Sequence, residues 1–169
     1  MQADENPIEV AVNITDRKRM EQVLRESERK YRDIFESSIE GIFQSTLDGR
    51  FINANPAAAR MLGYESPEDL VGTMKDMGSQ LYAHPEDRDK LVKLLREHGF
   101  VKNFEVLCRN KNGSAIWGVL NIHLVRDDNG NTVCLEGTCQ DITERKRTEK
   151  RSEERREGKE GRTRRMPRH

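Results

Sequence analysis

Histidine and cysteine, the residue types that most often bind metals or act as nucleophiles, are few in this sequence of 169 residues and are widely spaced. The three cysteines are Cys108, Cys134 and Cys139, an odd number with no metal-like spacing. The last two lie five positions apart, so on a strand their side chains would point to opposite faces. We therefore interpret all three as small buried or half-buried residues of a protein in a reducing cytoplasm.

The four histidines lack a second metal ligand at useful spacing. His98 shares one face of a predicted helix with leucines, so it could point inward, but its place before Gly99 also suits a helix-end cap. His84 fits the start of that helix, His123 lies on the outer face of a predicted strand, and His169 ends a polar tail. We expect no metal site.

The sequence has no nucleophile elbow, phosphate-binding loop or kinase signature, so we expect no catalysis. Up to residue 142 it has 18 Lys and Arg against 24 Asp and Glu, and residues 143–169 have 12 against 6. An acidic folded part argues against specific nucleic-acid binding. No apolar run approaches the roughly 18 residues of a membrane span, and no signal-peptide pattern is present, so we expect a cytoplasmic segment.

One segment occurs twice. "NITDRKRMEQ" at residues 13–22 closely matches "DITERKRTEK" at residues 141–150. The copies are 141 − 13 = 128 positions apart, which is roughly one domain and far more than the usual repeat period of about 20 to 50 residues. The repeat therefore indicates a junction between modules.

A helix is predicted over residues 15–35. Its seam residues recur at alternating steps of four and three: Met20, Leu24, Ser27, Tyr31 and Ile34. This period is typical of a short coiled coil, which predicts a homodimer through the N-terminal helix. An amphipathic helix that packs on its own domain would have a similar pattern, and both could hold.

The elements from residue 41 onward follow from turn and cap signals. Asp48-Gly49 predicts a hairpin between strands 41–47 and 50–54. Three helix starts follow, at Asn55-Pro56, Ser66-Pro67 and Pro85. Three more strands are predicted, in "VKNFEVLCR", "SAIWGVLNIHLV" and "TVCLEGTCQ". The fold class is α+β, with a single five-stranded antiparallel sheet, short helices on one face, and flanking N-terminal and C-terminal helices.

The order of these elements, together with "DGRFINANPAAARMLGY", "HPEDR", "NFEVLCRNKNGSAIW", "LVRDDNG" and "GTCQDITERK", resembles the PAS domain with its C-terminal PAC segment from bacterial multidomain sensors. The resemblance covers residues 28–146. It implies that residues 1–27 end a preceding PAS/PAC unit and continue into a linker helix. Residues 147–169 are then a polar charged tail, which we interpret as disordered or as a truncated linker, since residues 143–165 contain no apolar residue for a coiled-coil seam.

The resemblance implies that a cofactor can bind between the sheet and the short helices. Flavin photoadduct chemistry in this family uses a cysteine among those helices, and residues 55–99 contain none. Haem would need His98. We expect no cofactor, although a small metabolite could occupy the core; an ordinary filled core is the alternative. The candidate pocket residues are Met61, Leu91, Leu95, His98, Phe104, Val106, Leu120 and Ile122.

The junction residues are Asp141, Thr143 and Glu144, where the last strand meets the C-terminal helix. Asp141 can cap that helix, and Glu144 three positions on can reach back to close a capping box. The resemblance implies that such junctions transmit signals. It thus predicts a non-catalytic sensory and dimerisation module that acts on an adjacent PAS domain or on an output domain, a histidine kinase or a cyclic-dinucleotide enzyme. The alternative is a structural spacer between PAS domains without a ligand of its own.

Overall fold

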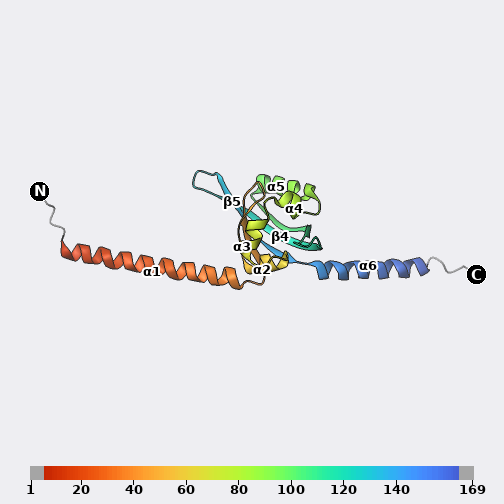
Figure 1. Cartoon of the computed structure of the whole chain (residues 1–169), viewed down its shortest axis with the longest axis horizontal. Helices are drawn as coiled ribbons and strands as arrows, with labels where there is room; N and C mark the ends of the chain where they lie inside the picture. Colours follow the sequence, from red (N-terminus) through yellow and green to blue (C-terminus); the bar gives the residue numbers. More distant parts are fainter. Residues whose placement is uncertain (1–5, 164–169) are drawn as a thin grey trace, which may run out of the picture. The chain divides into compact units, whose positions relative to one another are not determined.

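The chain divides into two units, residues 1–38 and residues 39–169 (Figure 1). The structure, a computed structural model, describes residues 6–163. The first unit contains helix α1 (Pro7–Ser37), and the second contains five strands and helices α2 to α6. The predicted boundary at residue 28 therefore falls inside α1.

Helix α1 begins eight residues earlier than the predicted start at residue 15, since 15 − 7 = 8. Asn6 caps it, because its Oδ1 accepts a hydrogen bond from the Ile8 N–H at 3.2 Å, and Pro7 takes the first helical position. The same Asn-Pro signal correctly predicted a helix start at Asn55, and at Asn6 it was overlooked. As a result, Ile14 and Thr15 of the first repeat lie inside a helix.

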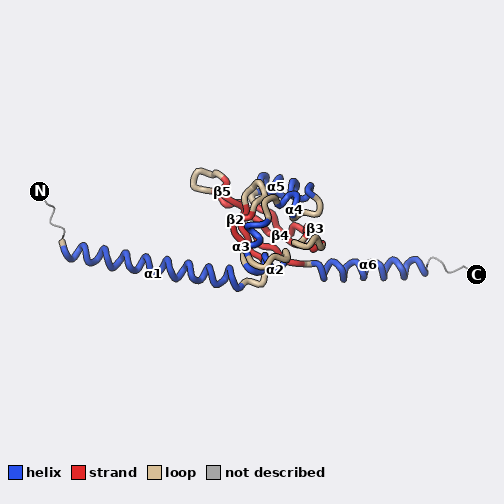
Figure 2. The backbone as a smooth tube through the Cα atoms, in the orientation of Figure 1, coloured by secondary structure: helices blue, strands red, loops and turns tan. Residues whose placement is uncertain are grey.

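The second unit is built on one antiparallel sheet with the strand order β2-β1-β5-β4-β3 (Figure 2). The predicted five-stranded antiparallel sheet is confirmed, and the strand ends differ by two residues or fewer. Gly49 has φ 99° in the first hairpin, as its turn requires. The strands are β1 (Gly41–Ser45), β2 (Phe51–Ala54), β3 (Phe100–Arg109), β4 (Ala115–Arg126) and β5 (Thr132–Asp141).

Four helices connect β2 to β3, one more than predicted: α2 (Pro56–Met61), α3 (Pro67–Thr73), α4 (Met77–Gln80) and α5 (Pro85–His98). The unpredicted one, α4, is a single turn that is too short to show a hydrophobic period. Its start is nevertheless capped, because Asp76 Oδ1 accepts a hydrogen bond from the Gly78 N–H at 3.0 Å.

The hydrophobic core lies between the sheet and these helices. Val106 and Cys108 of β3 and Leu120 and Ile122 of the neighbouring strand β4 are all buried on the core side of the sheet, as strand alternation requires. From the helices, Leu91 and Leu95 of α5 and Leu70 of α3 are fully buried. Burial of each such side chain contributes about 1.5 to 3 kcal/mol.

Asn55 fixes the start of α2 against β1. This residue is fully buried; its Oδ1 accepts from the N–H groups of Ile42 and Ala58, both at 2.9 Å, and its Nδ2 donates to the Glu40 carbonyl at 2.9 Å. The backbones are close here because Gly41 has no side chain: a Cβ would lie 3.0 Å from the Ala58 Cα. One amide side chain thus joins the strand to the helix.

The predicted C-terminal helix is α6 (Thr143–Thr163), which extends through residues 147–163, so the disordered alternative for this part of the tail is wrong, and the linker alternative stays a prediction. Its Glu, Lys and Arg residues have high helix propensity. The first turn is also held by the sheet, because the Ile142 N–H donates to the Trp117 carbonyl of β4 at 2.8 Å and the Ile142 carbonyl accepts the first helical hydrogen bond, from the Lys146 N–H at 3.0 Å. This attachment removes part of the nucleation cost. The rest of the predicted tail, residues 164–169, lies outside the described residues.

We expect Asn55→Ala to lower the free energy of unfolding by about 2 to 4 kcal/mol, because it removes a helix cap and leaves buried backbone groups without partners. Urea denaturation of the variant measures this loss. The matched control is Asn53→Ala, since Asn53 is exposed and its Oδ1 accepts only from the adjacent Ala54 N–H. The control should change stability by less than about 0.5 kcal/mol. Equal losses in the two variants would contradict the proposed role of Asn55.

Candidate functional site

The strand-to-helix junction is held by the backbone of Trp117 in β4. Ile142 lies between β5 and α6 with only 6% of its surface exposed, and its N–H donates to the Trp117 carbonyl at 2.8 Å. The Trp117 N–H in turn donates to Thr143 Oγ1 at 3.0 Å. Two consecutive residues of the junction are therefore bonded to one residue of the neighbouring strand.

Asp141 orients the Thr143 side chain. Its Oδ1 accepts hydrogen bonds from the Thr143 N–H at 2.9 Å and from the Thr143 hydroxyl at 2.5 Å. Because the hydroxyl donates to Asp141, its oxygen is free to accept from Trp117. Asp141 thus accepts a backbone hydrogen bond at the helix start, as expected, but from the first helical residue two positions on, and the Thr143 contact to β4 is an addition to it.

The predicted capping box is wrong. Glu144 Oε1 accepts from Arg147 Nη1 at 2.6 Å and does not reach back to Asp141. The helix begins at Thr143, so Glu144 is its second residue, whereas a capping box needs the third. Glu144 can still stabilise the first turn through the helix dipole.

A second set of contacts, which sequence reasoning missed, joins α6 to β3 and β4. The Glu105 carboxylate of β3 forms ion pairs with Lys146 and Arg145 of α6. The Lys146 Nζ also lies 5.0 Å from the centre of the Trp117 ring. We call these four residues the Glu105 clamp. The hydrogen bond from Lys146 is the main reason that the pKa of Glu105 is lowered below its usual value.

The sequence contained a partial signal for this clamp. Strand alternation puts Glu105 and Trp117 on the face opposite the buried Val106 and Gly118, and a basic triplet follows the junction. The pairing depends on the direction in which α6 leaves the sheet, and one sequence does not give that direction. Figure 1 shows α6 continuing from the end of β5.

The predicted pocket residues separate into three groups. Met61, Leu120 and Ile122 line a small interior cavity of about 30 Å³, which has room for about one water molecule. Leu91, Leu95, Val106 and Phe104 belong to the packed core, with Phe104 only partly buried. His98 is exposed. The cavity is also lined by Phe43, Phe51, Tyr82, Arg88, Cys108 and Cys139, among others.

The prediction that His98 could point into the core and bind haem there is wrong. The His98 side chain is 61% exposed, and its Nε2 lies 3.8 Å from Glu97 Oε2. The buried face of α5 follows Leu91 and Leu95, and His98 lies three residues further on, in the last turn before Gly99. At this position the imidazole is rotated away from the core.

The cysteines are buried and free, as predicted. Burial is the main cause that raises the pKa of Cys108 and of Cys139 to about 12, so both thiols remain protonated at neutral pH. Among residues 6–163, no group of three or more His, Cys, Asp or Glu side chains could hold a metal ion. The same residues include no helix with the length and apolar content to cross a bilayer.

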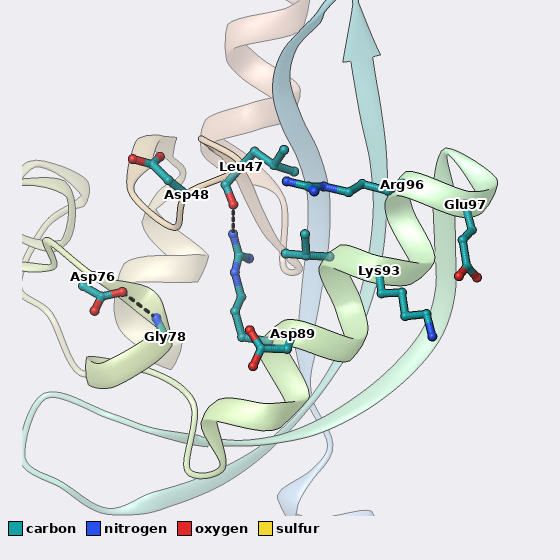
Figure 3. Close-up of a pocket in the computed structure, with 10 residues that line it drawn as sticks. Leu47, Asp48, Asp76, Gly78, Asp89, Lys93, Arg96 and Glu97 are labelled. Atoms are coloured by element: carbon teal, nitrogen blue, oxygen red, sulfur yellow. Dashed lines mark hydrogen bonds between the residues drawn. The ribbon is translucent and has the colours of Figure 1, made fainter.

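A larger opening lies on the surface, between the β1–β2 hairpin and helices α4 and α5 (Figure 3). Its volume is about 620 Å³, and most of the residues that line it are charged. Arg88 of α5 lies at its base with 7% of its surface exposed, and donates from Nη2 to the Leu47 carbonyl at 3.1 Å. Sequence reasoning gave Arg88 no role, because only the helix start was read from "HPEDR".

Residues 39–144 match the protein family described as PAS domain. The chain belongs to this family. Among curated proteins, "Probable diguanylate cyclase DgcE" of Escherichia coli K12 is 32% identical over 130 residues, which are 75% of this chain and 11% of that protein. The sensor histidine kinase TmoS of Ectopseudomonas mendocina is 28% identical over 139 residues, 80% of this chain and 14% of the kinase.

Solved structures show the same fold. The PAS domain of a Colwellia psychrerythraea protein has a TM-score of 0.59 at 21% identity, over 69% of this chain and 97% of that domain. A domain of a sensory box sensor histidine kinase/response regulator from Geobacter sulfurreducens has a TM-score of 0.55 at 24% identity, over 70% of this chain and 96% of that one. The chain spans about a tenth to a seventh of the length of the two curated relatives.

We expect Glu105→Gln to loosen the first turn of α6, because the charge that holds Lys146 and Arg145 is removed. Hydrogen exchange should show faster exchange for the amides of residues 145–149, while the core strands keep their protection. The pH dependence has a defined sign. Since the folded pKa of Glu105 is lowered, its stabilising contribution is present above the unfolded pKa and is lost as pH falls through the folded value.

The matched control for the Glu105 clamp is Glu136→Gln. Glu136 Oε2 lies 3.6 Å from His123 Nε2 on the same sheet, away from α6. This variant should leave exchange in α6 unchanged at all pH values. If Glu105→Gln behaves like the control, the clamp does not hold the helix.

Proposed function

We propose that this PAS domain is a non-catalytic sensory and signal-transmission module that passes a change in its core to an output domain through α6. The observation that carries the proposal is the double attachment of Ile142 and Thr143 to Trp117. β4 is paired with both β3 and β5. A shift of the central strands would therefore move the first turn of α6 directly.

The relatives support an enzyme as the output domain. One is named as a sensor histidine kinase and another as a diguanylate cyclase, and the present chain matches only a small part of each. We propose that a kinase or cyclic-dinucleotide enzyme is a separate part of the parent protein. We further propose a cytoplasmic location, which the three free, buried cysteines support.

A homodimer through α1 is the second part of the proposal. The apolar residues of the predicted seam are more than half exposed: Met20 74%, Leu24 59%, Tyr31 53% and Ile34 66%. Single exposed apolar residues need no explanation, but a row of them at coiled-coil spacing favours a partner helix. A second copy of α1 offers the same spacing.

A structural spacer is the second candidate function. The observation that favours it is the interior, which has only about 30 Å³ of empty volume and a continuous packed core. A spacer would connect neighbouring PAS domains through the same junction but would bind nothing. Saturable binding of a small molecule would separate a sensor from a spacer.

We expect Asp141→Ala to uncouple the domain from a histidine kinase fused after residue 163. Without the carboxylate, the Thr143 hydroxyl loses its acceptor and is no longer oriented toward Trp117, so only the Ile142 bond still attaches the start of α6. The autophosphorylation rate of the fused kinase should move to that of the kinase without a PAS domain. Circular dichroism should show that the sheet remains folded.

The matched control for Asp141 is Asp127→Ala. Asp127 also accepts backbone hydrogen bonds in a turn, from Asn129 and Asn131 at 3.0 and 2.8 Å, but it lies in the β4–β5 hairpin. This control should leave the kinase rate unchanged. Regulation that survives in Asp141→Ala would contradict signalling through the junction.

We expect Leu24→Glu to convert a dimer into a monomer, because the substitution places a charge in the α1 seam. Sedimentation equilibrium of the full chain over a range of concentrations measures the association constant. Gln22→Glu is the matched control, since it adds the same charge on the other side of α1, where Gln22 contacts Glu26. A wild-type chain that stays monomeric at all concentrations would rule out the dimer.

A further inference from the structure

Arg88 borders two empty spaces. Its side chain lines both the surface groove of about 620 Å³ and the interior cavity of about 30 Å³. The groove is mixed in character, whereas the cavity is almost entirely apolar. A molecule with a polar end and a short apolar end would match the two spaces, with its polar end in the groove and its apolar end in the cavity.

The charge of Arg88 is buried without a carboxylate in direct contact, although the more distant Asp48 interacts with it electrostatically. Its Nη2 donates to the carbonyls of Leu47 and Thr46 at 3.1 and 3.4 Å, and its guanidinium carbon lies 6.0 Å from the centre of the Tyr82 ring. In residues 6–163, no carboxylate oxygen lies within 4.0 Å of it. Buried arginines are usually paired, because a buried charge is costly when only neutral groups surround it.

The remaining donors of Arg88 suit a carboxylate. A guanidinium has five N–H groups in a planar fork. Two hydrogen bonds to the hairpin use Nη2 and a hydrogen bond to the Tyr82 side chain uses another donor, so at least two N–H groups remain. A carboxylate can accept two parallel hydrogen bonds from such a fork, and these are about twice as strong as neutral ones. Figure 3 shows that Arg96 extends across the groove toward Leu47, so a second guanidinium is near the same place.

The other groove residues limit the ligand to a single negative charge. Four carboxylates line the groove, at Asp48, Asp76, Asp89 and Glu97. Asp76 is already bonded to the Gly78 N–H and to the Ser79 hydroxyl at 2.7 Å. Three cations line the same groove, Arg88, Lys93 and Arg96, so the lining has 3 − 4 = −1 net charge. A dianion such as phosphate is repelled more strongly by this net charge than a monoanion held on the two arginines. The half-buried Leu47 and Val92 add an apolar wall.

We propose that this groove binds a short-chain monocarboxylate, with its carboxylate on Arg88 and Arg96 and its alkyl end directed to the interior cavity. The small cavity restricts the alkyl end to one or two carbon atoms, the size of acetate or propionate. Arg88 also holds the hairpin that follows β1, and β1 is paired with β5, which ends at the junction. The effect of binding on α6 through this hairpin rests on the proposed function. The binding site itself does not.

Propionate is the probe for the first test. In a titration of the full chain followed by two-dimensional NMR, the amide signals of Leu47 and Val92 should shift and saturate at millimolar propionate, as expected for so small a ligand. Sodium chloride at equal ionic strength serves as the salt control. The neutral molecule 1-propanol, which is similar in size, should bind about tenfold more weakly, which corresponds to about 1.4 kcal/mol.

Variants test the two arginines. Arg96→Gln should weaken propionate binding about tenfold without affecting the fold, since Arg96 is exposed. Lys90→Gln is the matched control, because Lys90 is on the same helix but pairs with Asp87 outside the groove, and its affinity should equal that of the wild type. Arg88→Lys keeps the charge but loses the fork, and it should bind propionate no better than propanol.

Three results would overturn the site: no saturable shift with propionate, equal affinity for propanol, or equal affinity in Arg96→Gln and Lys90→Gln. The first result would hold even if Arg88→Lys failed to fold, because it uses the wild-type chain. A different result would contradict the proposed signalling: the fused protein binds propionate normally, but Asp141→Ala leaves the regulation of its kinase unchanged. The two proposals can therefore fail separately.

Discussion

The attachment of the C-terminal helix depends on the backbone of Trp117. Its N–H and its carbonyl are both directed to the junction, one to Thr143 and the other to the Ile142 N–H. These bonds are possible because β4 extends past the end of β5 in register, with Gly118 opposite Asp141. The sheet register therefore sets where α6 begins, and the Glu105 clamp acts on a helix whose first residues are already placed.

Local chemistry in the sequence predicted most of the fold. Turn signals such as Asp48-Gly49 and caps such as Asn55-Pro56 gave the order of the elements, and the candidate pocket residues Val106, Leu120 and Ile122 are buried in the core. The errors occur where a side chain depends on distant residues. Glu105 and Arg145, whose side chains are paired, lie 40 positions apart in the sequence. Arg88 and Leu47, whose carbonyl accepts from the Arg88 side chain, lie 41 positions apart. Neither helical nor strand periodicity contains information about such pairs.

The two copies of the repeated segment show how context decides structure. Ile142 follows a strand and is 6% exposed, whereas Ile14 lies within α1 and is 49% exposed. Thr143 is bonded to a neighbouring strand, whereas the Thr15 hydroxyl donates to the Ala11 carbonyl of its own helix at 2.9 Å. The same residue types therefore form a junction only where a neighbouring strand offers backbone groups for hydrogen bonds.

The two ways in which α6 is attached respond differently to the surrounding solution. The ion pairs of Glu105 are partly exposed, and dissolved salt screens such pairs, with a Debye length of about 8 Å at physiological ionic strength. The backbone bonds to Trp117 are between neutral groups and are not screened. Concentrated salt would thus leave the start of α6 in place while it frees the side chains that hold the helix direction, so that α6 would swivel about a fixed point.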